Sequence, residues 1–276
     1  MKKAILIAGS IVLVIFSPCI IGLMSVTGIL GSMSADYHYQ CESAIGPDPS
    51  VTATPTTPTP ATAPEDAVST SPLPTTNPYA QLTLSPGQTP ESEWLGECLT
   101  AMKSAPLQGA PLRETNTGTA ARCAAQLALA GVGGSAGSGT GSGERQGGAQ
   151  AIEELARTAL YHASMAATTG RCGSATPAPV ARQSECPPPP RAADPGPVVL
   201  PRAMRDQGVC GERVDPGAIS PGDLLFWQYR RNAPTRMGIA ISDTYMVTED
   251  PSTGRLVRSE VPTTEELRVK RVLGSR

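Results

Sequence analysis

The sequence predicts an α+β fold in which helices precede a small antiparallel sheet. Three observations lead to this prediction. An uncharged, largely apolar run from Ala4 to Ser34 follows Lys2 and Lys3 and stands apart from the rest of the chain. Apolar residues then recur at helical spacing between Ala149 and Met165. After Leu200, five short apolar runs alternate with turn residues, which indicates strands joined by tight turns.

Composition limits the size of the folded part and the kinds of partner. The 276 residues carry a formal net charge of -2, so no basic excess points to nucleic acid. Aromatic residues are only 4% of the chain, and Gly and Pro number 28 each. We therefore expect one or two domains of modest size, diluted by long unstructured stretches.

Residues 1–35 are expected to anchor the chain in a cell membrane. A transmembrane helix needs about 20 apolar residues, whereas the apolar part of a signal peptide has only about 7–15. The lysines before the run should stay in the cytoplasm, which places the rest of the chain outside as a single-pass protein. Two alternatives remain open, namely cleavage near Ser34 or Ala35 to give a secreted protein, and lipidation of Cys19.

The cysteines are compatible with disulfides in an exported protein. Of seven cysteines, Cys19 lies in the apolar run, and the sequence leaves the pairing of the other six open. These six are Cys41, Cys98, Cys123, Cys172, Cys186 and Cys210. We expect no metal site and no cofactor, because the chain has no CxxC pair and its two histidines, His38 and His162, are far apart.

Residues 36–90 are expected to form a stalk. From residue 46 onward the segment is rich in Pro, Thr, Ser and Ala. Such a composition cannot bury enough apolar surface to offset the entropy of ordering. We expect an extended, semi-rigid spacer between the membrane anchor and the folded part, long enough to cross a cell wall.

The helices are expected on either side of a linker. Residues 91–132 look partly helical, and residues 133–149 form a Gly/Ser-rich linker. Ala149–Met165 reads as a well-formed helix, in which Glu153 and Glu154 suit the first turn.

Residues 150–276 are expected to form the main domain, with a Pro-rich insertion at 173–199. Asp223 follows Pro221-Gly222 at a turn, where its side chain can accept hydrogen bonds from turn amides. The five expected strands are Leu224–Trp227, Met237–Ile241, Tyr245–Thr248, a stretch around Leu256 and Val257, and Val269–Leu273.

Several motifs of this domain, in order, resemble the NlpC/P60 family of bacterial cell-wall cysteine peptidases. They are Leu200-Pro201-Arg202, Pro221-Gly222-Asp223-Leu224-Leu225-Phe226-Trp227, Met237-Gly238-Ile239-Ala240-Ile241 and Tyr245-Met246-Val247. The resemblance extends from residue 200 to about residue 273. It implies a papain-like domain with helices packed on a five-stranded antiparallel sheet.

The resemblance places Arg236 at the position of the family's catalytic His and Thr248 at that of its third catalytic residue. A cysteine peptidase needs a thiolate and a His that takes and returns its proton. Arg cannot replace the His because it stays protonated. No His follows His162, which precedes the motifs and so stands in the wrong order for the family. The resemblance therefore implies a member without the catalytic His.

Two cysteines are candidates for the nucleophile. Cys172 has the expected chain order, but Pro177 and Pro179 follow it, whereas the family's cysteine begins a long buried helix. Cys123 opens an apolar helix but lies farther from the motifs. Structural or disulfide roles are the favoured interpretation of both. A cysteine beside Arg236 would have a lowered pKa, but Arg236 could not protonate a leaving amine.

Four residues near Arg236 are candidates for binding. Trp227 and Tyr229 are expected on the same face of a strand, where they line a groove or simply pack. Arg230 and Arg231 extend beyond them, and with Arg236 they form a basic patch able to attract carboxylates of wall peptides or phosphates of wall polymers. The alternative for this patch is a solvated loop.

We therefore expect an exported, membrane-anchored, non-catalytic protein that acts at the cell wall as a binding or scaffold module, with peptidoglycan or another wall polymer as its partner. Two alternatives remain. One is an active cysteine peptidase of peptidoglycan stem peptides that uses Cys172 or Cys123 with His162. The other is a structural, disulfide-linked component of an envelope secretion or conjugation system.

Overall fold

The protein is described here from a computed structural model. The described residues are 36–50, 76–132, 149–173, 178–182, 185–187 and 196–274. The chain divides into two units, one ending at Gln40 and the other starting at Cys41. None of the helices among the described residues is both long and apolar enough to cross a bilayer. The proposed anchor at 1–35, with Cys19, lies outside these residues.

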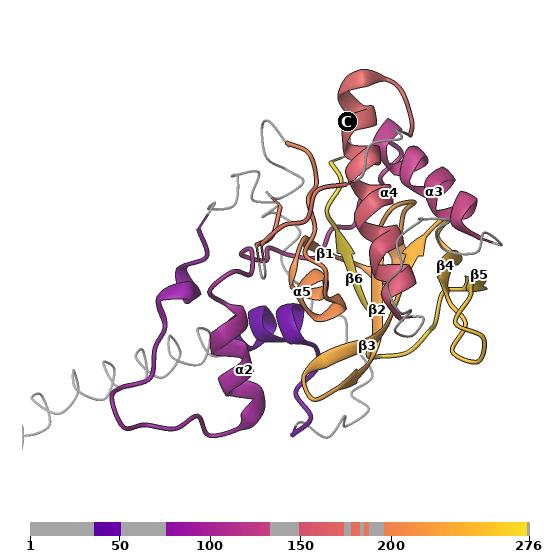
Figure 1. The fold of residues 1–276 in the computed structure, drawn as a ribbon. Helices are drawn as coiled ribbons and strands as arrows, with labels where there is room; N and C mark the ends of the chain where they lie inside the picture. Colours follow the sequence, from indigo (N-terminus) through magenta and orange to yellow (C-terminus); the bar gives the residue numbers. More distant parts are fainter. Residues whose placement is uncertain are drawn as a thin grey trace, which may run out of the picture. The chain divides into compact units, whose positions relative to one another are not determined.

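The second unit is built around one six-stranded antiparallel sheet, so the α+β prediction is confirmed (Figure 1). The strand order is β1-β6-β2-β3-β4-β5. The strands are β1 (Glu212–Val214), β2 (Leu224–Arg230), β3 (Ala233–Ala240), β4 (Tyr245–Glu249), β5 (Leu256–Glu260) and β6 (Arg268–Arg271). The five expected strands correspond to β2–β6, and β1 is additional. With only three residues, β1 is too short to show an alternating pattern in the sequence.

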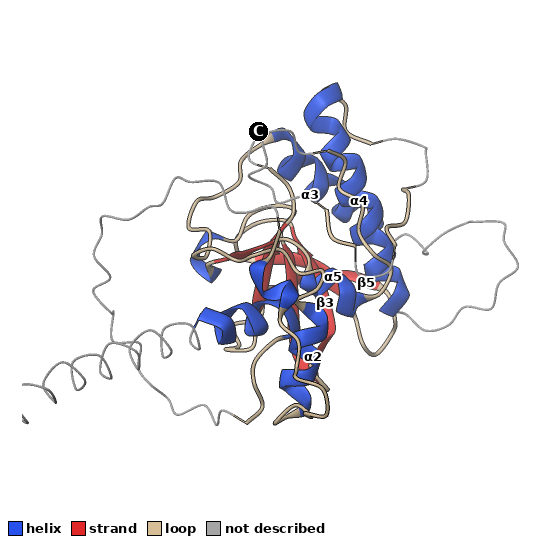
Figure 2. Cartoon of the chain, turned by 90° about the vertical axis from the view of Figure 1, so that its left-hand side faces the viewer, coloured by secondary structure: helices blue, strands red, loops and turns tan. Residues whose placement is uncertain are grey.

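Three helices lie near the expected positions, and a fourth, short one after Leu200 was not expected from the sequence. They are α2 (Glu93–Ala101), α3 (Thr119–Gly131), α4 (Ala149–Thr169) and α5 (Met204–Val209). Figure 2 shows α3 and α4 side by side, and α4 also contacts β3 and β4. Close packing of α3 on α4 is possible because alanines occupy the buried faces of both helices. The α4 helix runs beyond Met165 and stops at Gly170, whose φ of 67° suits a helix C-terminus.

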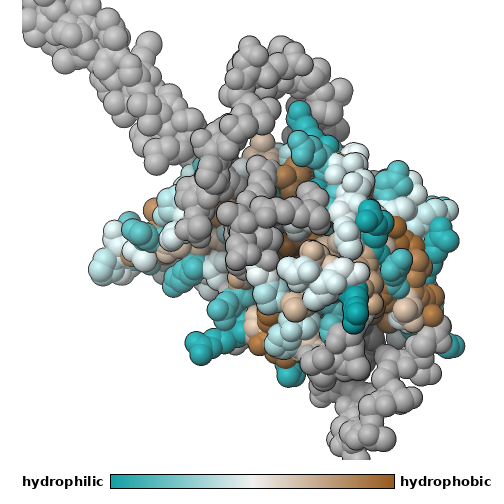
Figure 3. Space-filling view, turned by 90° about the horizontal axis from the view of Figure 1, so that it is seen from above, coloured by the Kyte–Doolittle hydropathy of each residue, from teal (hydrophilic) through white to brown (hydrophobic). Residues whose placement is uncertain are grey.

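The two faces of the sheet carry separate apolar cores, as alternation along the strands requires. One core joins sheet residues such as Phe226 and Ile239 to Ile152 and Leu160 of α4. The other is formed by strand and loop residues, among them Leu225, Trp227, Ala240, Met246, Leu267 and Val269. Apolar residues also remain on the surface, where they are intermixed with polar ones in the view from above (Figure 3). The exposed large apolar residues include Leu129 of α3 and Met165 of α4.

A buried ion pair joins the turn before β2 to β6. Arg271 Nε and Nη2 each lie 2.8 Å from a carboxylate oxygen of Asp223, and both side chains are almost fully buried. Arg271 also donates to the carbonyl oxygens of Glu114 and Ala218 and to Ser220 Oγ. The Ser220 amide donates to Asp223 Oδ2 at 2.8 Å, as expected for an Asp that binds a turn amide. The Arg partner was not anticipated.

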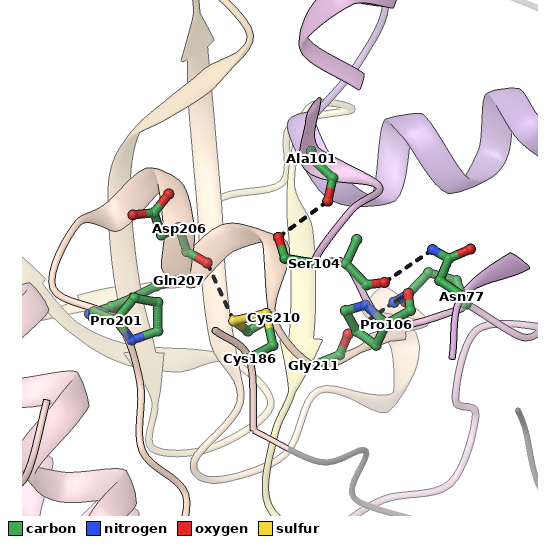
Figure 4. Close-up of a disulfide and its surroundings, with 12 residues drawn as sticks. Asn77, Ala101, Ser104, Pro106, Cys186, Pro201, Asp206, Gln207, Cys210 and Gly211 are labelled. Atoms are coloured by element: carbon green, nitrogen blue, oxygen red, sulfur yellow. Dashed lines mark hydrogen bonds between the residues drawn. A yellow bond between two sulfur atoms is a disulfide. The ribbon is translucent and has the colours of Figure 1, made fainter. Parts of the chain in front are cut away.

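The described part of the chain contains three disulfides, which pair all six cysteines that follow Cys19. They are Cys41–Cys98, Cys123–Cys172 and Cys186–Cys210. Figure 4 shows the last of these beside α5, next to Asp206 and Gln207. The Pro-rich insertion is thereby fixed to the domain at Cys186.

Parts of the range expected to be a stalk are folded. Residues 36–45 are helical, and a 3₁₀ helix, η1, spans Pro78–Gln81. Cys41, Ile45 and Asn77 are buried. Composition averaged over 36–90 conceals these short ordered stretches, which are held by contacts distant in the sequence. Residues 51–75, the Pro- and Thr-rich centre, lie outside the described residues.

Lys270 is the most unusual buried residue of the sheet. The residue is 1% exposed, and its Nζ has no hydrogen-bond partner among the residues that the structure describes. Burial lowers the pKa of this amine to about 7, and the charges of Arg213 and Arg268 act in the same direction, against that of Glu212. A charged Lys270 is therefore costly to the folded state.

We predict that Asp223→Asn lowers the free energy of unfolding by about 3–5 kcal/mol, because it leaves the Arg271 guanidinium buried without a counter-charge. Urea denaturation followed by circular dichroism measures the change. The control is Asp243→Asn, a change at an exposed turn, which should alter stability by less than about 0.5 kcal/mol. Equal effects of the two changes would contradict the structural role given to the pair.

We predict that Lys270→Met stabilises the protein at pH 7 by about 1–4 kcal/mol, because a thioether of similar length is cheap to bury. Below pH 7 the wild-type amine is charged in both the folded and the unfolded state, so the folded state bears the full cost of burying the charge. Between pH 7 and 10.5 only the unfolded state keeps the proton, so wild-type stability rises with pH. The advantage of the variant should therefore shrink over that interval. Urea denaturation across this range tests both points, with the exposed Lys103→Met as control, and a less stable Lys270→Met would contradict them.

Candidate functional site

Arg236, at the position that resembles the family's catalytic His, is held in place on β3. It lies opposite Trp227 on β2, and its guanidinium carbon is 5.9 Å from the centroid of the Trp227 ring. Its Nη2 donates to the carbonyl oxygen of Glu249. A permanent positive charge is thus held between an aromatic face and a backbone carbonyl oxygen, and this guanidinium group cannot accept a proton.

Thr248, which the resemblance places at the family's third catalytic position, uses its hydroxyl within the sheet. The residue is buried on β4 opposite Gly238. Its Oγ1 donates to the carbonyl oxygen of Met237 at 2.7 Å. The hydroxyl proton is therefore bound to backbone, although the strands do bring Thr248 close to Arg236 in the sheet.

Two glutamates complete this site, and the sequence motifs did not single them out for it. Burial raises the pKa of Glu249, and the charge of Arg236 opposes that rise. Burial also raises the pKa of Glu153 on α4, and the negative charge of Glu249 adds to this rise. The Met204 amide donates to Glu153 Oε1 at 2.9 Å, and this hydrogen bond lowers the pKa. The negative charge of Glu249 on β4 thus acts on the Glu153 carboxyl group of α4, a helix that contacts β4. The one signal in the sequence was that Glu249 directly follows Thr248.

The expectation that Trp227 and Tyr229 share a face is wrong. Trp227 packs in the core that includes Leu225, whereas Tyr229 packs against the opposite core. The cause is Gln228, whose φ of 55° breaks the regular alternation of the strand. The Tyr229 ring lies against Gly46, and burial raises the pKa of its hydroxyl. The two aromatic residues therefore cannot line one groove.

The two nucleophile candidates are bonded to each other. Cys123, in the second turn of α3, forms a disulfide with Cys172, which follows α4. A sulfur in a disulfide is not a thiolate and cannot attack a peptide carbonyl. The helix that packs on β3 and β4 is α4, and it contains no cysteine.

The remaining candidates lie apart from this site or at its edge. His162 is buried on α4, with its ring 5.3 Å from that of Tyr161. Arg230 and Arg231 are exposed where β2 ends and turns into β3. Arg231 and Asn232 both have positive φ, as a two-residue hairpin turn of type I′ requires. The tight turn makes both arginine side chains accessible from solvent.

Metal-binding groups and similarity to known proteins are two further sources of information on the site. Within the described ranges, no group of three or more His, Cys, Asp or Glu side chains could hold a metal ion. Comparisons with protein families, with curated proteins and with solved structures gave no match to this chain. The resemblance to the NlpC/P60 family therefore remains an inference from the motifs.

We predict that the six cysteines after Cys19 are protected from alkylation. The full chain, unfolded in guanidinium without reductant and treated with iodoacetamide, should gain one label, at Cys19. After reduction it should gain seven, one for each cysteine. Peptide mass spectrometry locates the labels, and Cys19 is the internal positive control. Labelling of Cys123 or Cys172 without reductant would contradict the disulfide.

Proposed function

We propose that this protein is anchored in a bacterial cell membrane and that its folded part is a non-catalytic NlpC/P60-like module which binds the cell wall. The observation that carries the non-catalytic assignment is the Cys123–Cys172 disulfide. It consumes both sulfurs that could have acted as the nucleophile. An export route is consistent with this, because disulfides persist in oxidising compartments.

The chemistry around Arg236 supports the same proposal. A peptidase of this kind must pass a proton from the thiol to the leaving amine. Arg236 cannot accept that proton, and the Thr248 hydroxyl is bound to a backbone carbonyl. The two glutamates bring carboxyl groups but no nucleophile.

Binding to the wall is assigned to the exposed end of the β2–β3 hairpin. Arg230 and Arg231 present two guanidinium groups to solvent. Guanidinium groups pair with planar carboxylates and with phosphates, the two anionic groups expected in wall peptides and wall polymers. Anchoring is assigned to residues 1–35 because of the apolar run and the lysines before it.

We predict that the full chain in detergent micelles sediments with purified cell wall and that Arg230→Gln/Arg231→Gln weakens this binding about 3- to 10-fold. Two exposed ion pairs at roughly 0.5 kcal/mol each account for that range. The matched control is Arg113→Gln/Arg202→Gln, which removes the same charge from two other exposed positions. Equal losses in the two variants would show that net charge alone, and not the hairpin, drives binding.

The same samples test the absence of catalysis. Wall incubated with the protein should release no shortened stem peptides, as measured by mass spectrometry. If peptides are released, and if Cys123→Ala or Cys172→Ala abolishes their release, the protein is a peptidase and the non-catalytic assignment fails.

A further inference from the structure

The disulfide Cys41–Cys98 changes the meaning of the Pro- and Thr-rich segment. Cys41 precedes this segment and Cys98, in α2, follows it, at a sequence separation of 57. Both cysteines are completely buried. The segment is therefore enclosed in a covalent loop and does not simply connect two parts of the chain in series.

The residues just before the segment belong to the folded unit. Trp94 of α2 donates its indole N–H to the Gly46 carbonyl oxygen at 3.1 Å. Gly46 lies so close to Tyr229 of β2 that a Cβ atom would stand 2.2 Å from the ring. Ile45 is 2% exposed. The chain has thus joined the sheet before the segment begins.

The residues just after the segment join the same unit. Asn77 is buried, and its Nδ2 donates to the Ala105 carbonyl oxygen at 3.0 Å (Figure 4). Its Oδ1 accepts from the Tyr79 amide at 3.0 Å and caps η1. Both ends of 51–75 are therefore fixed in one folded unit by non-covalent contacts as well as by the disulfide.

This arrangement sets how far the folded part can stand from an anchor at 1–35. The six residues from Ala35 to Cys41 span at most about 20 Å even when fully extended. A linear stalk over 46–90 would reach about 140 Å at about 3.1 Å per residue. The two arrangements therefore differ severalfold in reach.

We infer that the folded part lies directly at the membrane surface and that residues 51–75 form a closed excursion from it. This inference rests on the membrane anchoring in the proposed function. The spacer expected from composition is absent from the path between anchor and domain. The wall groups that the module meets are then those of the innermost layer, next to the bilayer.

The test is a cut within the excursion. A site for a sequence-specific viral protease replaces residues 56–62 of the full chain, which is produced in cells and cleaved in thiol-blocked spheroplasts. We expect the cleaved chain to run as one species on a denaturing gel without reductant and as two with reductant. The folded part should sediment with the membranes after the cut. Separation into two pieces without reductant, with release of the larger piece, would overturn the inference.

Two disulfide variants distinguish the linkage from general stability. Cys41→Ala/Cys98→Ala removes the bond across the cut, so the cleaved chain should give two pieces without reductant. Cys123→Ala/Cys172→Ala removes a disulfide with a similar sequence separation, 49 against 57. Both of these cysteines follow the cut, so this variant should give the same gel pattern as the wild type. If the uncut chain does not sediment with membranes, the proposed membrane anchoring is wrong. The gel without reductant still shows whether the two pieces of the cleaved chain are joined by the disulfide.

Discussion

The buried pair of Asp223 and Arg271 is the interaction on which the rest of the sheet depends. It joins the turn before β2 to β6 at the C-terminal end, and Arg271 also binds the Glu114 carbonyl, from the segment before α3. Burying two charges is costly, and here the cost is offset because Nε, Nη1 and Nη2 all find acceptors. A chain with only two Phe and two Trp has little apolar area to spare, so such polar connections and the disulfides carry an unusual share of its stability.

Much of the fold could be predicted because it rests on local patterns. Short apolar runs between turn residues predicted β2–β6, helical spacing predicted α4, and the Pro-Gly-Asp turn predicted that Asp223 accepts hydrogen bonds from turn amides. The features that the sequence did not predict depend on contacts between distant residues or on a single dihedral angle. Three residues of β1 are ordered by pairing with β6, and one positive φ at Gln228 turned Tyr229 to the other core. Neither has a signal in the composition of its segment.

The candidate site was predictable in position but not in chemistry. The motifs placed Arg236 just before one expected strand and Thr248 at the end of the next, and in the structure the two residues lie on the adjacent strands β3 and β4. Glu249 raises the pKa of Glu153 because α4 packs on β4, and no spacing in the sequence encodes that packing. The same holds for the Cys123–Cys172 bond, since six cysteines offered many pairings and only tertiary structure selects one.

The three disulfides have a further consequence for how the chain reaches its native state. The six cysteines after Cys19 are bonded in consecutive pairs, the first to the second, the third to the fourth and the fifth to the sixth. No bonded loop encloses or crosses another. A chain that emerges N-terminus first can therefore be oxidised one pair at a time, as each partner appears. Such a pairing order needs no isomerase to rearrange earlier bonds, and maturation can keep pace with synthesis.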